Sequence, residues 1–501
     1  MPSLFRNATW GGLSAAIRLV FGMANLFLAI RLAGAPAYGY VALMLSVAVI
    51  YLTFINSIHT IAVTHAADIK RSNTFQEQLT EVFSIVWTFT LAACVLITLL
   101  VLCFGDNFIQ GFVYWGNDNL LAAQIKTALF LLLVQLIFQL LSAANVAVME
   151  SLGRFDLAAR AQMFGPVLCF ILLSVMFLKS GIYPIQHVVL VITLAALLDT
   201  VLTTAVRLRM GYLAAYLPQK NILRLFLTLL KQGLSLQGSR LVNVFVDPLN
   251  KYLLNLFVGA ASVTVYEVAM KVITGIQGLF GGAFRTFLQL TNEMRINSGQ
   301  EYLKSLRYGL LPALLLHAIA GVLIIYLSIY WFRDGTSLLP ALFYLMTPAS
   351  VLIIFIAPLY FALIGIRDLK FIFQMNLNLA VFNVIGSVLF IPIFGVFGCA
   401  IGFTLAILFN AFMEYRRYVL KIGEIPELVK EIGALAPKLI LVAVIAACSL
   451  ITQGLFKASM PSILIQSVIL ASLVIMLLKQ PITTRMLEKT LALRPIKSNR
   501  I

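Results

Sequence analysis

The chain has 501 residues, of which 61% are hydrophobic and only 11% are charged. Its mean hydropathy of +0.99 excludes a soluble globular protein, which would need a far more polar surface. The formal net charge is +17. Because loops that face anionic lipid are rich in Lys and Arg, this charge indicates contact with membrane lipids rather than with nucleic acid.

Long apolar runs predict the fold class, an all-α polytopic membrane protein. A spanning helix needs about 20 mostly apolar residues, and fourteen such segments follow one another along the chain. They are 9–33, 38–63, 82–104, 125–149, 161–178, 186–206, 233–257, 264–288, 309–332, 338–364, 372–391, 396–415, 439–456 and 461–478. The first run is too long for a signal peptide and lacks a small-residue cleavage site, so we expect it to stay in the protein.

Positive charge is spread unevenly over the predicted loops. If the N-terminus faces the cytoplasm, most of the 36 Lys and Arg residues fall on the cytoplasmic side, as the positive-inside rule requires. With an even number of helices, this bias predicts that both termini are cytoplasmic.

The residues that usually mark catalytic or metal sites do not cluster in the sequence. The five cysteines and four histidines are scattered, no CxxC pair occurs, and no phosphate-binding GxxxxGK[ST] motif is present. We therefore expect neither a metal site nor a cofactor, no catalytic residues and no built-in ATPase.

Two pairs of similar segments indicate an internal repeat. GRFDLAARAQM (153–163) matches GIRDLKFIFQM (365–375) at an offset of 212, from 365 minus 153, and GLSAAIRLV (12–20) matches GLSLQGSRLV (233–242). We read these as two parallel six-helix repeats, an arrangement in which transporters place the substrate site between the halves. The predicted units are an N-terminal lobe (1–206), a cytoplasmic linker (207–232), a C-terminal lobe (233–415), and a segment with two extra helices and a basic tail (416–501).

Charged and polar residues recur inside the predicted spans. In the seventh span, six of them follow spacings of 3, 3, 4, 4 and 4 and so share one helical face. A charge at the centre of a spanning helix costs about 2.5–3.5 kcal/mol, so we expect this face to avoid lipid. The residues are Gln237, Arg240, Asn243, Asp247, Lys251 and Asn255 in the seventh span, Ser14, Arg18 and Asn25 in the first, Glu267 and Lys271 in the eighth, and Asp199 in the sixth.

Two interpretations of these charges stay open. In the first, the charges are structural ion pairs: Asp247 with Lys251 or Arg240, and Glu267 with Lys271. In the second, they line a cationic chamber that binds an anionic head group, because arginine suits the forked hydrogen bonding of phosphate oxygens. The predicted substrate-binding residues are then Arg18, Arg240, Lys251, Lys271, Asn25 and Asn243, and the candidates for ion coupling are the carboxylates Asp247, Glu267 and Asp199.

Four stretches carry a family resemblance. They are RLAGAPAYGYVAL (31–43), SLGRFDLAAR (151–160), DPLNKYLLNLFVGAASVTVYEVAMKV (247–272) and IPIFGVFGCAIGFTLA (391–406). Together they resemble the polysaccharide flippases, which move O-antigen or capsule repeat units, of the multidrug/oligosaccharidyl-lipid/polysaccharide exporter (MOP) superfamily. The resemblance covers the first twelve spans, and the last two match only in being hydrophobic.

The resemblance implies a non-enzymatic flippase of the bacterial inner membrane. Its substrate would be an undecaprenyl-pyrophosphate-linked oligosaccharide repeat unit for O-antigen, capsule or exopolysaccharide synthesis, translocated by alternating access, with polysaccharide polymerase machinery as a further partner. Three alternatives stay open. One is a lipid II-type flippase, another is a cation-coupled exporter of small amphipathic molecules, and the third is a membrane glycosyltransferase or polymerase, for which the outer loop 105–119 offers few candidate acids.

Overall fold

The structure, a computed structural model, describes the chain in separate stretches. They are residues 2–69, 75–113, 119–152, 154–179, 181–210, 238, 242, 244–284, 298–328, 338–366 and 368–421. Within these stretches the secondary structure is helical and contains no strand. In lipid, backbone groups must be hydrogen-bonded within the segment itself, which is why such apolar runs form helices.

The described helices follow the predicted spans one for one up to the twelfth. They are α1 (Pro2–Ala33), α2 (Ala35–Ile69), α3 (Phe75–Val113), α4 (Asn119–Ser151), α5 (Phe155–Leu178), α6 (Ile185–Arg209), α8 (Ala260–Phe284), α10 (Ser298–Tyr326), α11 (Leu339–Gly365), α12 (Leu369–Phe394) and α13 (Val396–Lys421). Residues 244–257 form one more helical segment before α8. Ten of the helices contain spans long and apolar enough to cross a membrane, which confirms the all-α polytopic fold.

Two predicted features lie outside the described residues. The thirteenth and fourteenth spans, 439–456 and 461–478, are not described, nor is most of the linker, 211–232. The division into two six-helix lobes therefore stays a prediction.

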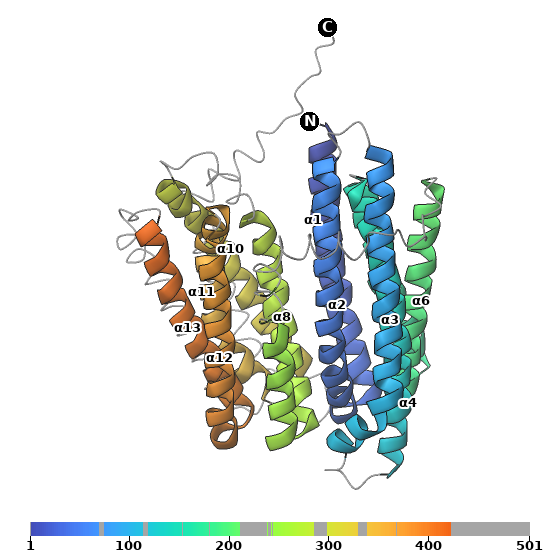
Figure 1. The fold of residues 1–501 in the computed structure, drawn as a ribbon. Coiled ribbons are helices and arrows are strands. Elements are labelled where there is room, and N and C mark those ends of the chain that lie inside the picture. Colours follow the sequence, from blue (N-terminus) through green and yellow to red (C-terminus); the bar gives the residue numbers. More distant parts are fainter. Residues whose placement is uncertain are drawn as a thin grey trace.

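The helices pack in chain-ordered groups (Figure 1). In the first group α1 packs on α5, α4 on α6 and α2 on α4; in the second α12 packs on α13, and α11 on both α13 and α8. The groups meet where α8 packs against α2 and α1. The start of α1 and the end of α13 lie at the same end of the molecule (Figure 1).

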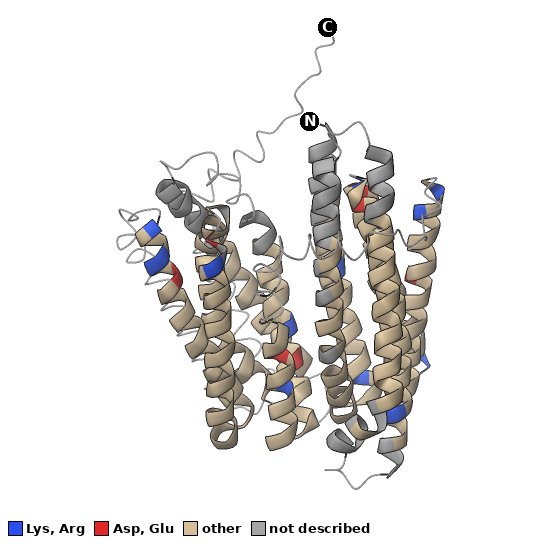
Figure 2. Cartoon of the chain, viewed as in Figure 1, with Lys and Arg blue, Asp and Glu red and all other residues tan. Residues whose placement is uncertain are grey.

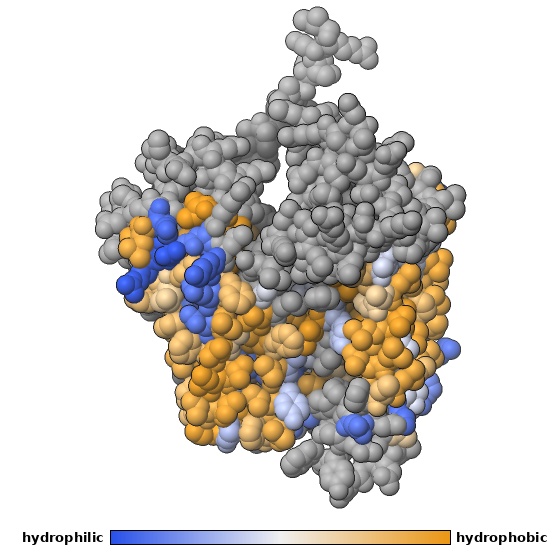
Figure 3. All heavy atoms as spheres, viewed as in Figure 1, coloured by the Kyte–Doolittle hydropathy of each residue, from blue (hydrophilic) through white to orange (hydrophobic). Residues whose placement is uncertain are grey.

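Polarity is distributed as a membrane location requires. Figure 3 shows a broad hydrophobic surface over the described helices on the visible face. Figure 2 shows the charged residues mainly near helix ends, with a small group of both signs along α8. That group is the exception to an otherwise apolar middle, and it directs attention to α8.

The matched segments at 153–163 and 365–375 both follow a tight turn between consecutive helices. The Arg154 amide donates to the Met149 carbonyl at 3.0 Å, and the Asp368 amide donates to the Leu363 carbonyl at 3.1 Å. In both turns the donor follows the acceptor by five residues, which closes the end of a helix. The similar turns support the predicted repeat.

The turn before α12 predicts a pH effect on stability. The Arg417 guanidinium donates from Nε to the Asp368 carboxylate at 2.6 Å and holds the pKa of that carboxyl below its usual value. A carboxyl with a lowered folded-state pKa contributes stability above its unfolded pKa of about 3.9 and loses it as the pH falls further. We expect Asp368→Asn to flatten the fall in melting temperature between pH 6 and pH 3, and Lys370→Ala to leave it unchanged. An unaltered acid profile in Asp368→Asn would contradict this assignment.

Candidate functional site

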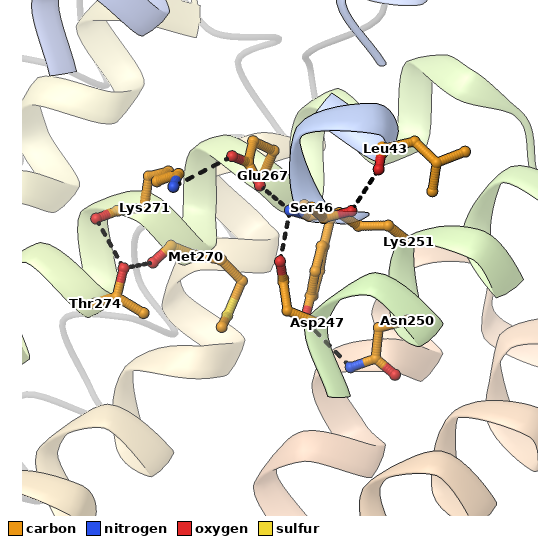
Figure 4. A network of polar contacts seen from close by, with 10 residues as sticks. Leu43, Ser46, Asp247, Asn250, Lys251, Glu267, Met270, Lys271 and Thr274 are labelled. Atoms are coloured by element: carbon orange, nitrogen blue, oxygen red, sulfur yellow. Dashed lines mark hydrogen bonds and ion pairs between the residues drawn. The ribbon is translucent and has the colours of Figure 1, made fainter. Parts of the chain in front are cut away.

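Four charged residues form a linked group where the segment 244–257 lies beside α8 (Figure 4). The Lys251 ammonium lies 2.6 Å from Asp247 Oδ2 and 2.5 Å from Glu267 Oε2. Lys271 Nζ lies 3.7 Å from Glu267 Oε1, one helical turn along α8. The pairs Asp247 with Lys251 and Glu267 with Lys271, predicted from their i, i+4 spacing, therefore form. The bond from Lys251 to Glu267 adds a link between the two helices.

The members of this group differ sharply in exposure. The side chains of Lys251 and Glu267 are 3% and 5% exposed, whereas those of Asp247 and Lys271 are 37% and 54% exposed. Lys251 is thus enclosed between two carboxylates, and a ligand can reach Lys271 more easily than any other member. The group has two cations and two acids, so it is balanced overall but presents a lysine outward.

An uncharged network holds the segment 244–257 in place. The Asn250 amide donates to Asn383 Oδ1 at 2.8 Å and to the Tyr266 hydroxyl at 3.2 Å, and Ser387 donates to Asn250 Oδ1 at 2.8 Å. Asn250, Asn383, Tyr266 and Ser387 are all buried. Buried, mutually bonded polar groups fix helix positions, so this network ties the segment to α8 and α12 and orients Lys251.

Arg18 lies on α1 and is exposed. Its Nε donates to the Ser14 carbonyl of its own helix at 3.4 Å, and the Glu150 carboxylate of α4 attracts it electrostatically. The next residue, Leu19, fills the space beside Gly275 of α8. Since Gly275 is one helical turn after Lys271, the two exposed cations lie on α1 and α8 beside the place where these helices meet.

Other predicted residues are occupied within the first helix group. The Asn25 amide donates to the Pro166 carbonyl of α5 at 2.9 Å. Asp199 on α6 accepts a hydrogen bond from the Ser142 hydroxyl of α4 at 2.7 Å. These partners join α1 to α5 and α6 to α4, and neither residue is bonded to the charged group along α8.

Two predicted binding residues of the seventh span, Arg240 and Asn243, lie outside the described residues. Their roles stay predictions. They precede the segment 244–257, in which Asp247 and Lys251 occupy the same predicted helical face.

The beginnings of α2 and α8 are in close contact. Thr264 Oγ1 donates to the Ala35 carbonyl at 2.6 Å. Gly39 packs so closely on Ala260 that a Cβ there would collide with the Ala260 carbonyl oxygen. Gly34 permits the turn between α1 and α2 with its φ of +84°. The APAYGY motif therefore forms a contact that holds the two helix groups together at this end.

Sequence reasoning missed two acids. Glu150 was not weighed as a partner of Arg18 because it lies at the edge of the fourth predicted span, on a different helix. Glu414 was not singled out, although a carboxylate inside an apolar span is itself a signal. It lies on α13 and is 1% exposed.

Solved transporter structures share this fold. A structure of the lipid II flippase MurJ in an inward closed conformation has a TM-score of 0.68 at 14% identity, covering 96% of this chain and 99% of that one. An inward-facing multidrug resistance MATE family transporter of the MOP superfamily has a TM-score of 0.64 at 15% identity, covering 83% and 99%. A MOP superfamily transporter from Pyrococcus furiosus Vc1 (DSM3638), described as having a binding pocket of reverse polarity, has a TM-score of 0.60 at 16% identity, covering 84% and 95%.

No protein-family model matches the sequence, and a comparison with curated proteins finds no match. The shared fold therefore defines the class: the chain has the polytopic, all-helical architecture seen in MOP superfamily transporters. At these identities the likeness concerns the fold, and the substrate has to be argued from the site.

Proposed function

We propose that this protein is a flippase that moves undecaprenyl-pyrophosphate-linked oligosaccharide repeat units across the bacterial inner membrane by alternating access. The observation that carries the proposal is the exposure of Arg18 and Lys271 on the facing helices α1 and α8. Their nearest acid on α8, Glu267, is buried. A ligand entering between these helices therefore meets positive charge first.

The chemistry of a pyrophosphate head group suits this surface. Arginine offers forked donors to phosphate oxygens, and lysine adds a compact positive charge. A cation on a spanning helix costs about 2.5–3.5 kcal/mol if it faces lipid, so these two side chains are favoured where water or an anionic head group can reach them. The lipid tail could remain against the hydrophobic outer surface (Figure 3).

The cellular setting proposed here follows the same reasoning. The positive-inside bias favours cytoplasmic termini, and the start of α1 and the end of α13 do lie at one end of the molecule (Figure 1). The product would serve O-antigen, capsule or exopolysaccharide synthesis, with polymerase machinery as the recipient. Transport rather than catalysis is the proposed activity, in keeping with the solved transporters of this fold.

We expect Arg18→Ala and Lys271→Ala each to weaken the binding of undecaprenyl pyrophosphate by about tenfold, because a hydrogen bond to a charged group contributes about 1.5–3 kcal/mol. Titration of the purified protein with this lipid in detergent micelles measures the change. Lys179→Ala is the matched control, since it removes an exposed positive charge after α5, and it should leave the affinity unchanged.

The comparison ligands separate the alternatives. If lipid II binds with the same dependence on Arg18 and Lys271 but the oligosaccharide lipid does not, the protein is a lipid II-type flippase. If a small organic cation binds instead and both substitutions strengthen its binding, the site belongs to an exporter of amphipathic molecules. Equal weakening by Lys179→Ala would show that only overall charge matters.

A further inference from the structure

A second cavity lies within the other helix group. Residues of α8, α11, α12 and α13 enclose it, and its volume is about 270 Å³. Its lining is mostly apolar, but Glu414 and Asn410 of α13 lie one helical turn apart in its wall. The charged group described above contributes no lining residue, so this is a separate site.

Two oxygen atoms in this wall have no hydrogen-bond partner. They are Glu414 Oε1 and Asn410 Oδ1, on side chains of residues that are only 1% and 5% exposed. The backbone of Tyr360 bonds to the Glu414 carboxyl group, but Oε1 is left unsatisfied. A buried acceptor without a partner costs about 1–3 kcal/mol, and more if it is charged, so two of them in one wall indicate a missing ligand.

The backbone of α11 supplies another free acceptor beside the same cavity. Pro358 lies inside α11 and has no amide hydrogen. The carbonyl four residues earlier, that of Ile354, therefore lacks its usual helical donor, and Ile354 lines the cavity. Freed carbonyls of interrupted helices are a common source of cation ligands in transporters.

The charge of the lining also favours a cation. Among the residues that line the cavity, Glu414 is the only one with a charged side chain, and no Lys or Arg balances it. Arg417, one turn beyond Glu414, is bonded to Asp368 instead. A buried carboxylate needs a counter-charge, and a single carboxylate with neutral oxygens balances a monovalent ion but not a divalent one.

We propose that Glu414 and Asn410, with the Ile354 carbonyl, form a binding site for one monovalent alkali cation. Oxygen atoms are the ligands that hard cations prefer, and the cavity has room for the ion together with water. A proton on Glu414 would neutralise the carboxylate but would supply no positive ion to share between it and the Asn410 oxygen. The site does not depend on the identity of the transported substrate.

Equilibrium binding of radioactive sodium to the purified full-length protein tests the proposal, with potassium and choline chloride as competitors at constant ionic strength. Glu414→Gln keeps the shape of the side chain and removes its charge, and Asn410→Ala removes the second oxygen. Outer-shell changes already cost about 10–100-fold in metal affinity, so loss of a direct ligand should weaken binding by at least about tenfold. Asp368→Asn removes a carboxylate that Arg417 already holds and should bind sodium as the wild type does.

The possible outcomes are distinct. Sodium or potassium binding that is weakened in Glu414→Gln and Asn410→Ala but retained in Asp368→Asn supports the site, provided that size-exclusion profiles show folded protein. Absence of alkali-ion binding in the wild type, or unchanged binding in Glu414→Gln, would overturn it. A response to pH alone, with no competition by either alkali ion, would also overturn it and would assign Glu414 to a proton.

Discussion

Replacing Lys251 by methionine should destabilise the protein by about 3–5 kcal/mol, the usual cost of breaking a buried ion pair by removing one partner. Lys251 is 3% exposed and lies between Asp247 and Glu267. Without its ammonium group, the buried carboxylate of Glu267 would keep only the distant Lys271, at 3.7 Å. The free energy of unfolding, measured by chemical denaturation in mixed micelles, gives the effect directly.

A double-variant cycle separates the ion pair from simple loss of packing. Glu267→Gln in the Lys251→Met background should restore part of the lost stability, because it removes the carboxylate left unpaired. Lys271→Met is the matched control: its side chain is 54% exposed, and exposed pairs contribute about 0–1 kcal/mol. If Lys251→Met costs no more than Lys271→Met, the group is not the buried structural link that the geometry indicates.

Gly39→Val should separate the beginnings of α2 and α8. A Cβ at position 39 would collide with the Ala260 carbonyl oxygen, a backbone atom that cannot rotate away. Overpacking of this kind costs about 1–3 kcal/mol, which would reduce the population of the closed contact about tenfold. In a protein that works by alternating access, we expect conformations open at this end to become dominant and transport to fall.

Spin labels report this change as a distance. Cysteines placed at Ala37 and Ser262, in a background without the five native cysteines, lie in the first turns of α2 and α8. The wild type should give one short distance, and Gly39→Val a longer or broader distribution. Gly181→Val is the control, because a Cβ there meets only the Tyr183 ring at 3.8 Å. Identical distance distributions in Gly39→Val and the wild type would show that the contact is not a gate.

Much of the fold could be predicted from the sequence because its signals are local. Hydrophobic runs of helical length identified the spans through α13, and the i, i+4 spacing identified Asp247 with Lys251 and Glu267 with Lys271. These features depend on residues within one helix, whose geometry is fixed by the helical repeat.

The links between helices could not be read from the sequence. Which lysine is enclosed and which is exposed depends on how the segment 244–257 packs on α8, and helical spacing does not contain that information. The same holds for the attraction between Arg18 and Glu150 on α4, and for Asn25, whose amide bonds to α5. The prediction that all cations share one chamber treated helical faces as if their neighbours were known.

The charge balance refines the proposed transport path. With Glu150 beside Arg18 and two acids beside Lys251 and Lys271, the described charges are paired rather than in cationic excess. What favours an anionic ligand is the exposure of Arg18 and Lys271 compared with the burial of Glu267. Arg240, outside the described residues, is the remaining predicted cation of the chamber.

The most direct test of the central claim is transport in liposomes that contain the purified protein and a fluorescent undecaprenyl-pyrophosphate oligosaccharide. The account predicts that the labelled sugar becomes accessible on the opposite leaflet only when the protein is present. It also predicts that the folded double variant Arg18→Ala, Lys271→Ala loses this activity while Lys179→Ala retains it. A wild-type protein that moves no lipid-linked sugar but exports a small organic cation down a proton gradient would contradict the flippase proposal.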